Sequence, residues 1–519
     1  MRTASQLNWQ GRELPSTPET TTEGFSKPQG DVKVNSKYSI TLQAAQAACT
    51  LTLLCAYTGA NAQRPTRNDD EWQTAPTIDS HQLRERVKPA PVPRIAIAPV
   101  STPFRPTHIE HTPRRMRGIR NALWVVAGTL SSPQSIHTMV GDAVEAGFDT
   151  LFVQVRARGD AVYFSSFEPR AEMLDRAGRD YDPLAQVIYE AHAKGIKVHA
   201  WMNTFVLWGR STRPTSPEHI FNRHPEWIAR DKNNEYAKVA TKTLEGAYLQ
   251  ASNPDVQEHL YNVFTEVAQK YDVDGIHFDY CRYANSEYDY STATLKRFRN
   301  SMREKLSMDE VAQVDRDERL NRTAWATAYP SEWGAWRRAQ VTNLVARISE
   351  SVKRMRNIVV SAAVYPNASD AAKYKGQDWQ KWLDTGTLDM VALMAYSGDA
   401  ERIGRETAQA VSIANGKTVL TGLPAYSRSV PDMRGLIRSA LQSGANGIAF
   451  FAYNRLNATP ENLKTLAREV GIERQEHGSP QDMEGEYGSG SRKPLTEEVS
   501  FIQPNEEKPL RVRRKYRKR

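Results

Sequence analysis

Cysteine is scarce in this chain of 519 residues, which has only Cys49, Cys55 and Cys281. The first two lie in an apolar stretch near the N-terminus that is expected to be removed, so the mature protein has no internal disulfide framework. Cys-x-x-Cys, His-x-x-x-His and His-Glu-x-x-His patterns are all missing. No metal ion or other cofactor is therefore expected.

The chain also has no excess of positive charge outside its C-terminal end. The formal net charge is +9, but eight of these positive charges lie at the C-terminal end, on Lys508, Arg511, Arg513, Arg514, Lys515, Arg517, Lys518 and Arg519. The rest of the chain is nearly neutral, so nucleic acid is not an expected partner. Only the basic tail is a candidate contact for an anionic surface.

Charged residues are absent from residues 38–63, a run that two lysines precede and that ends in Ala60-Asn61-Ala62. A charged start, an apolar run and a small-x-small ending are typical of an export signal. The apolar part is short, so a retained membrane anchor is the weaker alternative, and no stable membrane insertion is expected after cleavage. We assign residues 1–62 to an N-terminal extension plus signal peptide and expect a periplasmic, cell-surface or secreted protein.

Two further segments lack the pattern of a packed domain. Residues 63–116 are rich in proline and polar residues, which indicates an extended linker. Residues 473–519 are rich in Gly, Ser, Glu and Lys and end in the basic run. Both flanking segments are expected to be disordered.

Residues 117–472 alternate short apolar runs with longer helical patterns. The eight runs are residues 122–126, 150–155, 197–202, 275–279, 358–364, 390–396, 418–423 and 447–451. Eight strands alternating with helices predict a closed (β/α)8 TIM barrel, with long loops after the third and fourth strands. A doubly wound open sheet is the alternative, but no Gly-rich phosphate loop follows any of the runs.

Polar residues gather at the C-terminal ends of three runs, where TIM barrels carry their chemistry. Side chains alternate along a strand, so apolar Ile276 and Phe278 should face the helices. The same rule points these side chains into the upper barrel: Gln154, Arg156, His199, Trp201, Asn203, His277 and Asp279, with Arg282 just beyond. Hydrogen-bonding groups beside a large aromatic fit a polyhydroxylated ligand. Alternatively, Arg156 and Asp279 form a structural ion pair and His199 is a core histidine.

Asp279 is the only carboxylate at the C-terminal end of a predicted strand, which makes it the leading catalytic candidate, as a nucleophile or as a base toward water. Cleavage of a glycosidic bond normally needs a second carboxyl group to protonate the leaving oxygen. The rim loops offer four, Asp160, Glu332, Asp399 and Glu401. Asp160 is favoured because it closely follows the second run.

These residues lie in motifs that resemble the bacterial glycosyl-hydrolase-like family ten, a group of exported barrel proteins. The matching stretches are residues 154–163 (QVRARGDAVY), 199–203 (HAWMN), 273–283 (VDGIHFDYCRY) and 394–396 (MAY). The resemblance implies a (β/α)8 domain acting on glycosidic bonds, with peptidoglycan glycan strands as the expected substrate of some relatives. Two positions depart from the family pattern: Tyr280 replaces a second Asp, and Ala284 replaces a Pro.

The favoured hypothesis is an exported glycoside hydrolase acting on a polysaccharide such as a peptidoglycan glycan strand. Asp279 would work with Asp160, an adjacent arginine would keep Asp279 ionised, and Gln154 and Tyr396 would orient the sugar. The other predicted substrate contacts are Arg156, His199, Trp201, Asn203, His277 and Arg282. A non-catalytic carbohydrate-binding barrel attached to cell-wall polymer is the main alternative. The third is a metal-dependent deacetylase using His199, His277 and Asp279.

Overall fold

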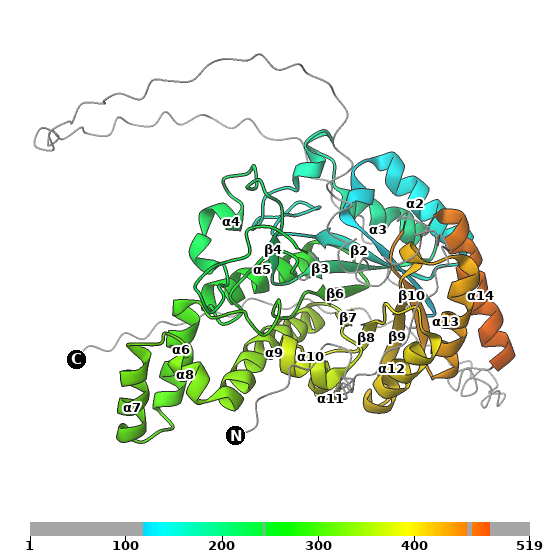
Figure 1. The fold of residues 1–519 in the computed structure, drawn as a ribbon. Helices are drawn as coiled ribbons and strands as arrows, with labels where there is room; N and C mark the ends of the chain where they lie inside the picture. Colours follow the sequence, from blue (N-terminus) through cyan, green and yellow to red (C-terminus); the bar gives the residue numbers. More distant parts are fainter. Residues whose placement is uncertain (1–117, 242–243, 454–458, 478–519) are drawn as a thin grey trace, which may run out of the picture. The chain divides into compact units, whose positions relative to one another are not determined.

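The computed structural model describes residues 118–241, 244–453 and 459–477 (Figure 1). The predicted signal peptide and linker, and the tail beyond residue 477, lie outside the described residues. Within the described part, no helix combines the length and the apolar character needed to cross a membrane.

Eight parallel strands close into a barrel in the order β1-β10-β9-β8-β7-β6-β3-β2, which confirms the predicted TIM barrel. Each strand begins and ends within one residue of a predicted run, except that β8 ends two residues earlier than predicted. The strands are β1 (Asn121–Val125), β2 (Thr150–Arg156), β3 (Lys197–Asn203), β6 (Gly275–Asp279), β7 (Val359–Val364), β8 (Met390–Met394), β9 (Thr418–Leu423) and β10 (Gly447–Phe450).

Helices surround the barrel (Figure 1). They are α2 (Pro133–Ala146), α3 (Pro183–Ala193), α5 (Pro254–Lys270), α9 (Pro330–Met355), α10 (Ala368–Lys375), α11 (Trp379–Asp384), α12 (Ala400–Ile413), α13 (Val430–Gln442) and α14 (Pro460–His477). The side chains of Ser132, Asp182 and Asn253 accept hydrogen bonds from first-turn N–H groups of α2, α3 and α5, each of which begins with proline. A polar cap followed by proline is therefore what starts these helices.

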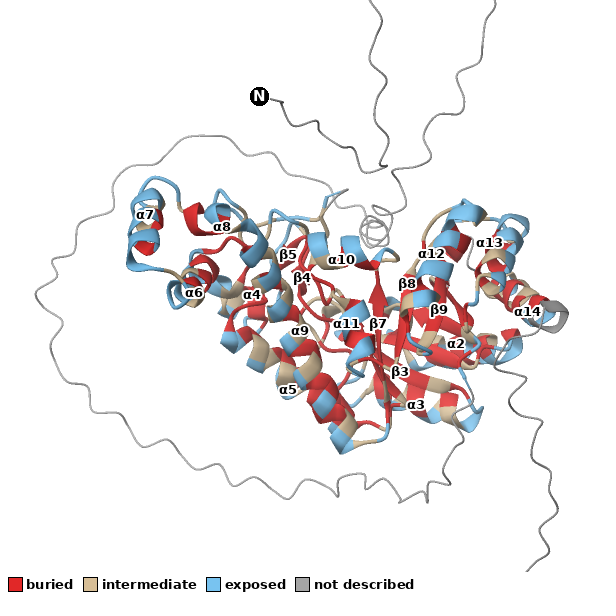
Figure 2. Cartoon of the chain, turned by 90° about the horizontal axis from the view of Figure 1, so that it is seen from below, coloured by how far each residue is buried: buried red, intermediate tan, exposed pale blue. Residues whose placement is uncertain are grey.

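The strand side chains divide between two cores, as the predicted alternation requires. Val198, Ala200 and Phe278 belong to the large core between barrel and helices. Trp124, Phe152 and other inward side chains form a smaller core inside the barrel. Figure 2 shows the strands buried beneath partly exposed helices. The lower barrel is thus filled with side chains and is not a channel.

The two long loops both leave C-terminal strand ends, as predicted. After β3 lie the hairpin β4 (Val206–Trp208) and β5 (Ala247–Tyr248), with α4 (Ile220–Arg223) between its strands. After β6 lie α6 (Thr292–Arg303), α7 (Met308–Glu318) and α8 (Ala324–Ala328), which share a separate apolar core. Short 3-10 turns complete the fold: η1 (Ala127–Leu130), η2 (Glu172–Leu174), η3 (Pro225–Trp227) and η4 (Ala425–Ser427).

Candidate active site at the C-terminal end of the barrel

The ends of β3 and β6 are bonded directly to each other. Asn203 and Asp279 are register partners. Beyond them, Thr204 N donates to the carbonyl of Asp279 at 2.7 Å, and Phe205 N donates to that of Tyr280 at 3.2 Å. These bonds hold the first residues of both long loops against the barrel rim. Asp279 is therefore fixed by the sheet and not by a free loop.

Three donors converge on the Asp279 carboxylate. Trp201 Nε1 lies 3.2 Å from Oδ2, while Arg282 Nη1 and Tyr280 N lie 3.0 and 2.6 Å from Oδ1. Tyr280 has a φ of 49°, in the left-handed region that residues other than glycine seldom occupy. The turn at Tyr280 precedes Arg282, whose guanidinium lies over the Tyr280 ring at 4.1 Å from its centroid.

The pKa of Asp279 lies above its ordinary value because burial outweighs the opposing effects of Arg282 and of the hydrogen bonds. Arg282 is the adjacent arginine that was expected to favour the ionised form, and its effect on the pKa is smaller than that of burial. The arginine is present, as Arg282, but only 6% of Asp279 is exposed to solvent. A carboxyl group whose pKa is raised in this way is suited to holding and giving up a proton during a reaction.

Aromatic side chains cover the barrel interior beside Asp279. Phe451, directly after β10, has its ring centroid 6.2 Å from that of Trp201, 5.6 Å from Tyr396 and 5.9 Å from Tyr426. Trp201 and Tyr396 were predicted to belong to the site, whereas Phe451 and Tyr426 were missed. Aromatic faces of this kind suit the apolar faces of sugar rings.

Arg156 lies elsewhere than predicted. The register of β2 against β3 shifts between Gln154 and Arg156, so the alternation rule fails at that point. The guanidinium is fully buried and paired with Glu168, at 2.8 Å from Nε and 2.6 Å from Nη2. It also donates to the carbonyls of Asn203 and Thr204. Arg156 therefore pairs with Glu168, not Asp279, and is too deeply buried to contact a hydroxyl group of a sugar.

The two predicted histidines lie deeper in the barrel than a substrate contact would. His277 accepts from Trp124 Nε1 at 3.2 Å, contacts Ser361 Oγ at 2.8 Å and stacks on Phe152. His199 is fully buried, and neither of its ring nitrogens has a hydrogen-bond partner among the described residues. Both are core histidines, which corrects their assignment as sugar contacts. No metal-binding group of three His, Cys, Asp or Glu side chains occurs in the described chain.

His199 should make the folded protein sensitive to acid. Burial lowers its pKa from the ordinary 6.5 to about 4. The resulting stabilisation is complete above pH 6.5 and is lost as the pH falls toward 4, because protonation then favours the unfolded chain. Between about pH 7 and about pH 4.5, we expect this residue to remove about 2 to 3 kcal/mol from the free energy of unfolding.

Urea unfolding at the two pH values measures this effect. The His199→Gln variant should lose less stability on acidification than the wild type, whatever its stability at neutral pH. His137 is a matched control because its side chain is 74% exposed and forms only a surface pair with Glu190. The assignment would be wrong if His199→Gln and His137→Gln showed the same acid dependence as the wild type.

The remaining predicted residues lie near the rim. Gln154 Oε1 accepts from Ala127 N at 3.2 Å, and Asn203 Nδ2 donates to the carbonyl of Ala157 at 2.9 Å. The Oδ1 atom of Asn203 is buried without a partner in the described part of the chain. Asp160 Oδ1 accepts from Arg158 N at 3.0 Å and is partly exposed. These contacts leave Asp160 accessible but do not join it to Asp279.

The other candidates for the second acid have different surroundings. Asp399 caps α12 by accepting from the N–H groups of Glu401 and Arg402. Glu401 pairs with Arg405 on the exposed face of the same helix. Glu332 lies exposed in the first turn of α9. None of these carboxylates contacts the residues that hold Asp279, and Asp160 forms no hydrogen bond with them either. Asp160 stays the preferred candidate because it closely follows β2.

Glu245, which sequence reasoning missed, is a further rim carboxylate. Its Oε2 accepts from the hydroxyl of Tyr248 at 2.9 Å, and the Tyr248 ring lies 6.3 Å from that of Tyr280. No sequence signal placed Glu245 here, because the β4–β5 hairpin brings it to the rim from within a long loop.

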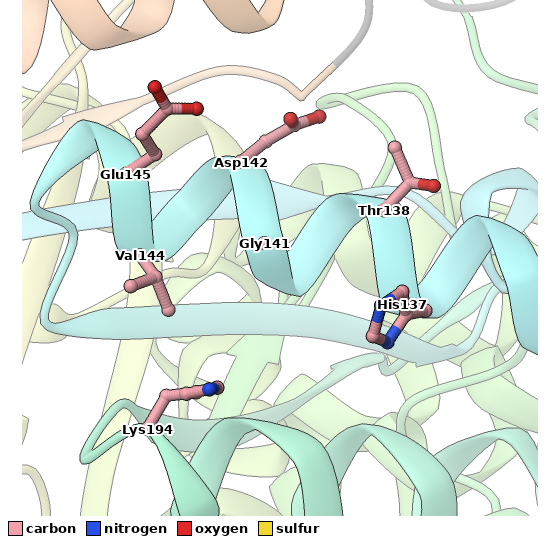
Figure 3. A pocket seen from close by; sticks show the side chains of 7 residues that line it. All are labelled: His137, Thr138, Gly141, Asp142, Val144, Glu145 and Lys194. Atoms are coloured by element: carbon pink, nitrogen blue, oxygen red, sulfur yellow. The ribbon is translucent and has the colours of Figure 1, made fainter.

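A surface pocket lies at α2 and the end of α3, and none of the residues around Asp279 lines it. Its lining residues are His137, Thr138, Gly141, Asp142, Val144, Glu145 and Lys194 (Figure 3). In Figure 3, the side chains of Glu145 and Asp142 point to the side of α2 opposite to Val144 and His137. Polar groups do not converge there, so the pocket is not the candidate active site.

Known proteins match this chain in sequence and fold. Residues 116–433 match the family described as Glycosyl hydrolase-like 10. Glycosyl hydrolase YngK of Bacillus subtilis (strain 168) is 24% identical over 279 residues, covering 50% of this chain and 48% of YngK. Glycosyl hydrolase DigH of Escherichia coli (strain K12) is 26% identical over 278 residues, covering 48% of this chain and 55% of DigH. The chain thus matches about half the length of these relatives.

A solved structure shares the fold. The glycoside hydrolase domain of PgaB (BpsB) from Bordetella bronchiseptica superposes with a TM-score of 0.50 and 14% sequence identity, over 67% of this chain and 99% of that domain.

Proposed function

Because the chain belongs to the Glycosyl hydrolase-like 10 family, as its motifs predicted, we propose that it hydrolyses glycosidic bonds of a polysaccharide. The observation that carries the proposal is the Asp279 carboxyl group, whose pKa burial raises and which three donors fix beside the aromatic rings at the barrel rim. A glycoside hydrolase-like TIM barrel with such a group has one of the two carboxyl groups that cleavage requires.

In the proposed reaction, the Asp279 carboxyl group donates its proton to the glycosidic oxygen as the bond from that oxygen to the anomeric carbon breaks. A water molecule adds to the anomeric carbon, and its proton passes to a second carboxylate, for which we propose Asp160. These roles of Asp279 and Asp160 are the reverse of those expected from the sequence. Tyr396 and Phe451, which are both partly exposed, hold the sugar rings by their aromatic faces. Arg282 and Trp201 fix the orientation of Asp279 through their hydrogen bonds.

The proposed substrate is the glycan strand of peptidoglycan, and the proposed location is outside the cytoplasm. Support for export comes from the charge-free run at residues 38–63, which ends in a small-x-small pattern. N-terminal sequencing of the protein recovered from the cell envelope tests export, and a mature chain beginning at Gln63 is expected.

Reducing ends released from defined glycans test the activity. The full chain is incubated with peptide-free peptidoglycan strands and with a panel of neutral polysaccharides. New reducing ends from any of these polymers support the hydrolase. Tight retention of the protein on a glycan that yields no products would contradict it and favour a carbohydrate-binding barrel.

A further inference from the structure

Arg282 is a buried arginine bordered by aromatic rings. Only 3% of the residue is exposed, and its one hydrogen-bond partner among the described residues is Asp279, whose Oδ1 lies 3.0 Å from Nη1. A single bond to one Nη atom does not fix the plane of the guanidinium. The rings beside it do, because a guanidinium is attracted to aromatic faces. They belong to Tyr280 and Tyr365, whose centroids lie 4.1 and 5.3 Å from the Cζ atom of Arg282.

Tyr365 reaches Arg282 from outside the loop after β6. It directly follows β7, the strand beside β6 in the barrel, and the residue is partly exposed. Tyr280, in contrast, belongs to the same turn as Asp279 and Arg282 and would move with them. Tyr365 is thus a contact through which the barrel itself can fix Arg282.

Two buried side chains hold the backbone of Tyr365. Gln377 Oε1 accepts from Tyr365 N at 3.0 Å, and Trp379 Nε1 donates to the carbonyl of Tyr365 at 3.0 Å. Neither Gln377 nor Trp379 is exposed to solvent. The amide nitrogen of Gln377 also lies 3.8 Å from Sγ of Cys281, the residue before Arg282. Gln377 therefore joins the ends of β6 and β7 at the place where Tyr365 meets Arg282.

The charged and titratable groups around Arg282 come from several elements. Asp279 is the only carboxylate among the described groups that contact it, so a change in the position of Arg282 acts first on Asp279. The others are Tyr280 and Cys281 after β6, Tyr365 after β7, Lys375 of α10, whose Nζ lies 5.3 Å from the centroid of the Tyr365 ring, and Tyr248 of β5, whose ring lies 6.3 Å from that of Tyr280 and whose hydroxyl donates to Glu245.

We propose that Tyr365 is a positioning residue of the active site: its ring holds the Arg282 guanidinium where Nη1 reaches Asp279, and so sets the pH range in which Asp279 donates a proton. This inference rests on the proposed function and adds a residue to its machinery. The positive charge of Arg282 opposes the effect of burial on the pKa of Asp279. A guanidinium that has lost the ring contact would oppose burial less, so Asp279 would keep its proton to higher pH.

The indole resonance of Trp201 measures the protonation of Asp279 without any substrate, because Trp201 Nε1 donates to Asp279 Oδ2. The full chain is labelled with 15N in its 11 tryptophans, and Trp201→Phe identifies the resonance. The titration step that Asp279→Asn abolishes is the one to follow. In Tyr365→Leu, its midpoint should lie about 0.5 to 1 pH unit above that of the wild type, as expected for the loss of one buried cation–π contact.

Two further variants separate the ring of Tyr365 from its hydroxyl group and from its volume. Tyr365→Phe keeps the aromatic face and should restore the wild-type midpoint. Tyr365→Met fills much of the same space without a ring, so it should show the same upward shift as Tyr365→Leu. It also provides the test where Tyr365→Leu does not fold.

The same shift should appear in the pH dependence of hydrolysis. Asp279 donates a proton in the proposed reaction, so kcat falls on the alkaline side as this group becomes ionised. The alkaline limb should move up by about 0.5 to 1 pH unit in Tyr365→Leu and return to the wild-type position in Tyr365→Phe. A loss of stability alone would reduce the amount of active protein without moving this limb.

Tyr374→Leu is the matched control. Lys373 Nζ lies 5.0 Å from the centroid of the Tyr374 ring, and Tyr374 is 46% exposed on α10. Loss of this exposed cation–π contact should leave the Trp201 titration at the wild-type midpoint. A wild-type midpoint in folded Tyr365→Leu would overturn the inference. An equal shift in Tyr365→Phe would also overturn it, because the effect would then belong to the hydroxyl group.

The two readouts separate this inference from the proposed function. If Tyr365→Leu shifts the Trp201 titration and the wild type cleaves no glycan, the hydrolase is wrong and the positioning of Arg282 by Tyr365 stands. If the wild type cleaves glycans and neither the titration nor the alkaline limb moves in Tyr365→Leu, the hydrolase stands and the inference is wrong.

Discussion

Replacing Asp279 with Asn should lower the rate of glycan hydrolysis by about 100- to 10,000-fold, the contribution expected of a positioned acid–base group. The asparagine side chain is similar in shape and keeps one oxygen to accept from Tyr280 N or Trp201 Nε1. The asparagine side chain cannot hold or release the proton. Its NH2 group is a donor, so it cannot accept the hydrogen bond that the replaced carboxylate oxygen accepted. The change therefore removes chemistry while largely preserving the shape of the site.

Initial rates of reducing-end release at substrate saturation measure this effect, with a thermal melt of each protein to confirm folding. Asp309→Asn is the matched control, because Asp309 is exposed on α7, in the helical lobe after β6. It should retain the wild-type rate. If a folded Asp279→Asn protein kept half or more of the wild-type rate, the catalytic role of Asp279 would be wrong.

The barrel could be predicted from the sequence because its strands are buried on both faces and appear as short apolar runs. Proline and a polar cap before α2, α3 and α5 marked where helices begin. Alternation within the runs then assigned Ile276 and Phe278 to the helix side and Asp279 to the inside. These are local signals, and the structure follows them wherever strand pairing is regular.

The site was less predictable because alternation gives the side of a strand but not the depth of a residue. Each step of two residues toward the start of a strand lowers a side chain by about 6.6 Å. His277 and His199 are therefore one and two levels below the rim, inside the packed core. Depth depends on which residues of neighbouring strands are register partners, such as His199 and Gly275, and a single sequence does not contain that information.

Arg156 shows a second limit of sequence reasoning. A shift of one residue in the pairing of β2 with β3 turns its side chain away from the barrel interior. Its partner Glu168 lies in the loop between β2 and α3, with no local pattern to connect the two. The pairing emerges only when β2, this loop and α5 pack together, because His259 of α5 also contacts Glu168, at 3.1 Å.

Breaking the buried ion pair of Arg156 and Glu168 should lower the free energy of unfolding more than the replacement of His199 does. Burial alone would raise the pKa of Glu168, but Arg156 and His259 lower it to about 2, so the carboxylate stays ionised at neutral pH. Glu168→Gln leaves the fully buried Arg156 guanidinium without a counter-charge. We expect the free energy of unfolding to fall by about 3 to 5 kcal/mol.

Urea unfolding of a double-mutant cycle tests whether the loss belongs to the pair. The effects of Glu168→Gln and Arg156→Met should be far from additive, with a coupling of about 2 kcal/mol or more. The exposed pair of Arg347 and Glu258 is the control, with side chains 44% and 55% exposed, and its coupling should stay below about 1 kcal/mol. Equal coupling in the two cycles would contradict the assigned role of burial.

The same variant tests whether this pair supports the active site. Arg156 donates to the carbonyls of Asn203 and Thr204, and Thr204 N in turn donates to the carbonyl of Asp279. Loosening Arg156 should therefore displace the backbone that positions Asp279, lowering the hydrolysis rate even where Glu168→Gln remains folded. If Glu168→Gln kept the wild-type rate under conditions in which it remains folded, the pair would stabilise the fold without positioning Asp279.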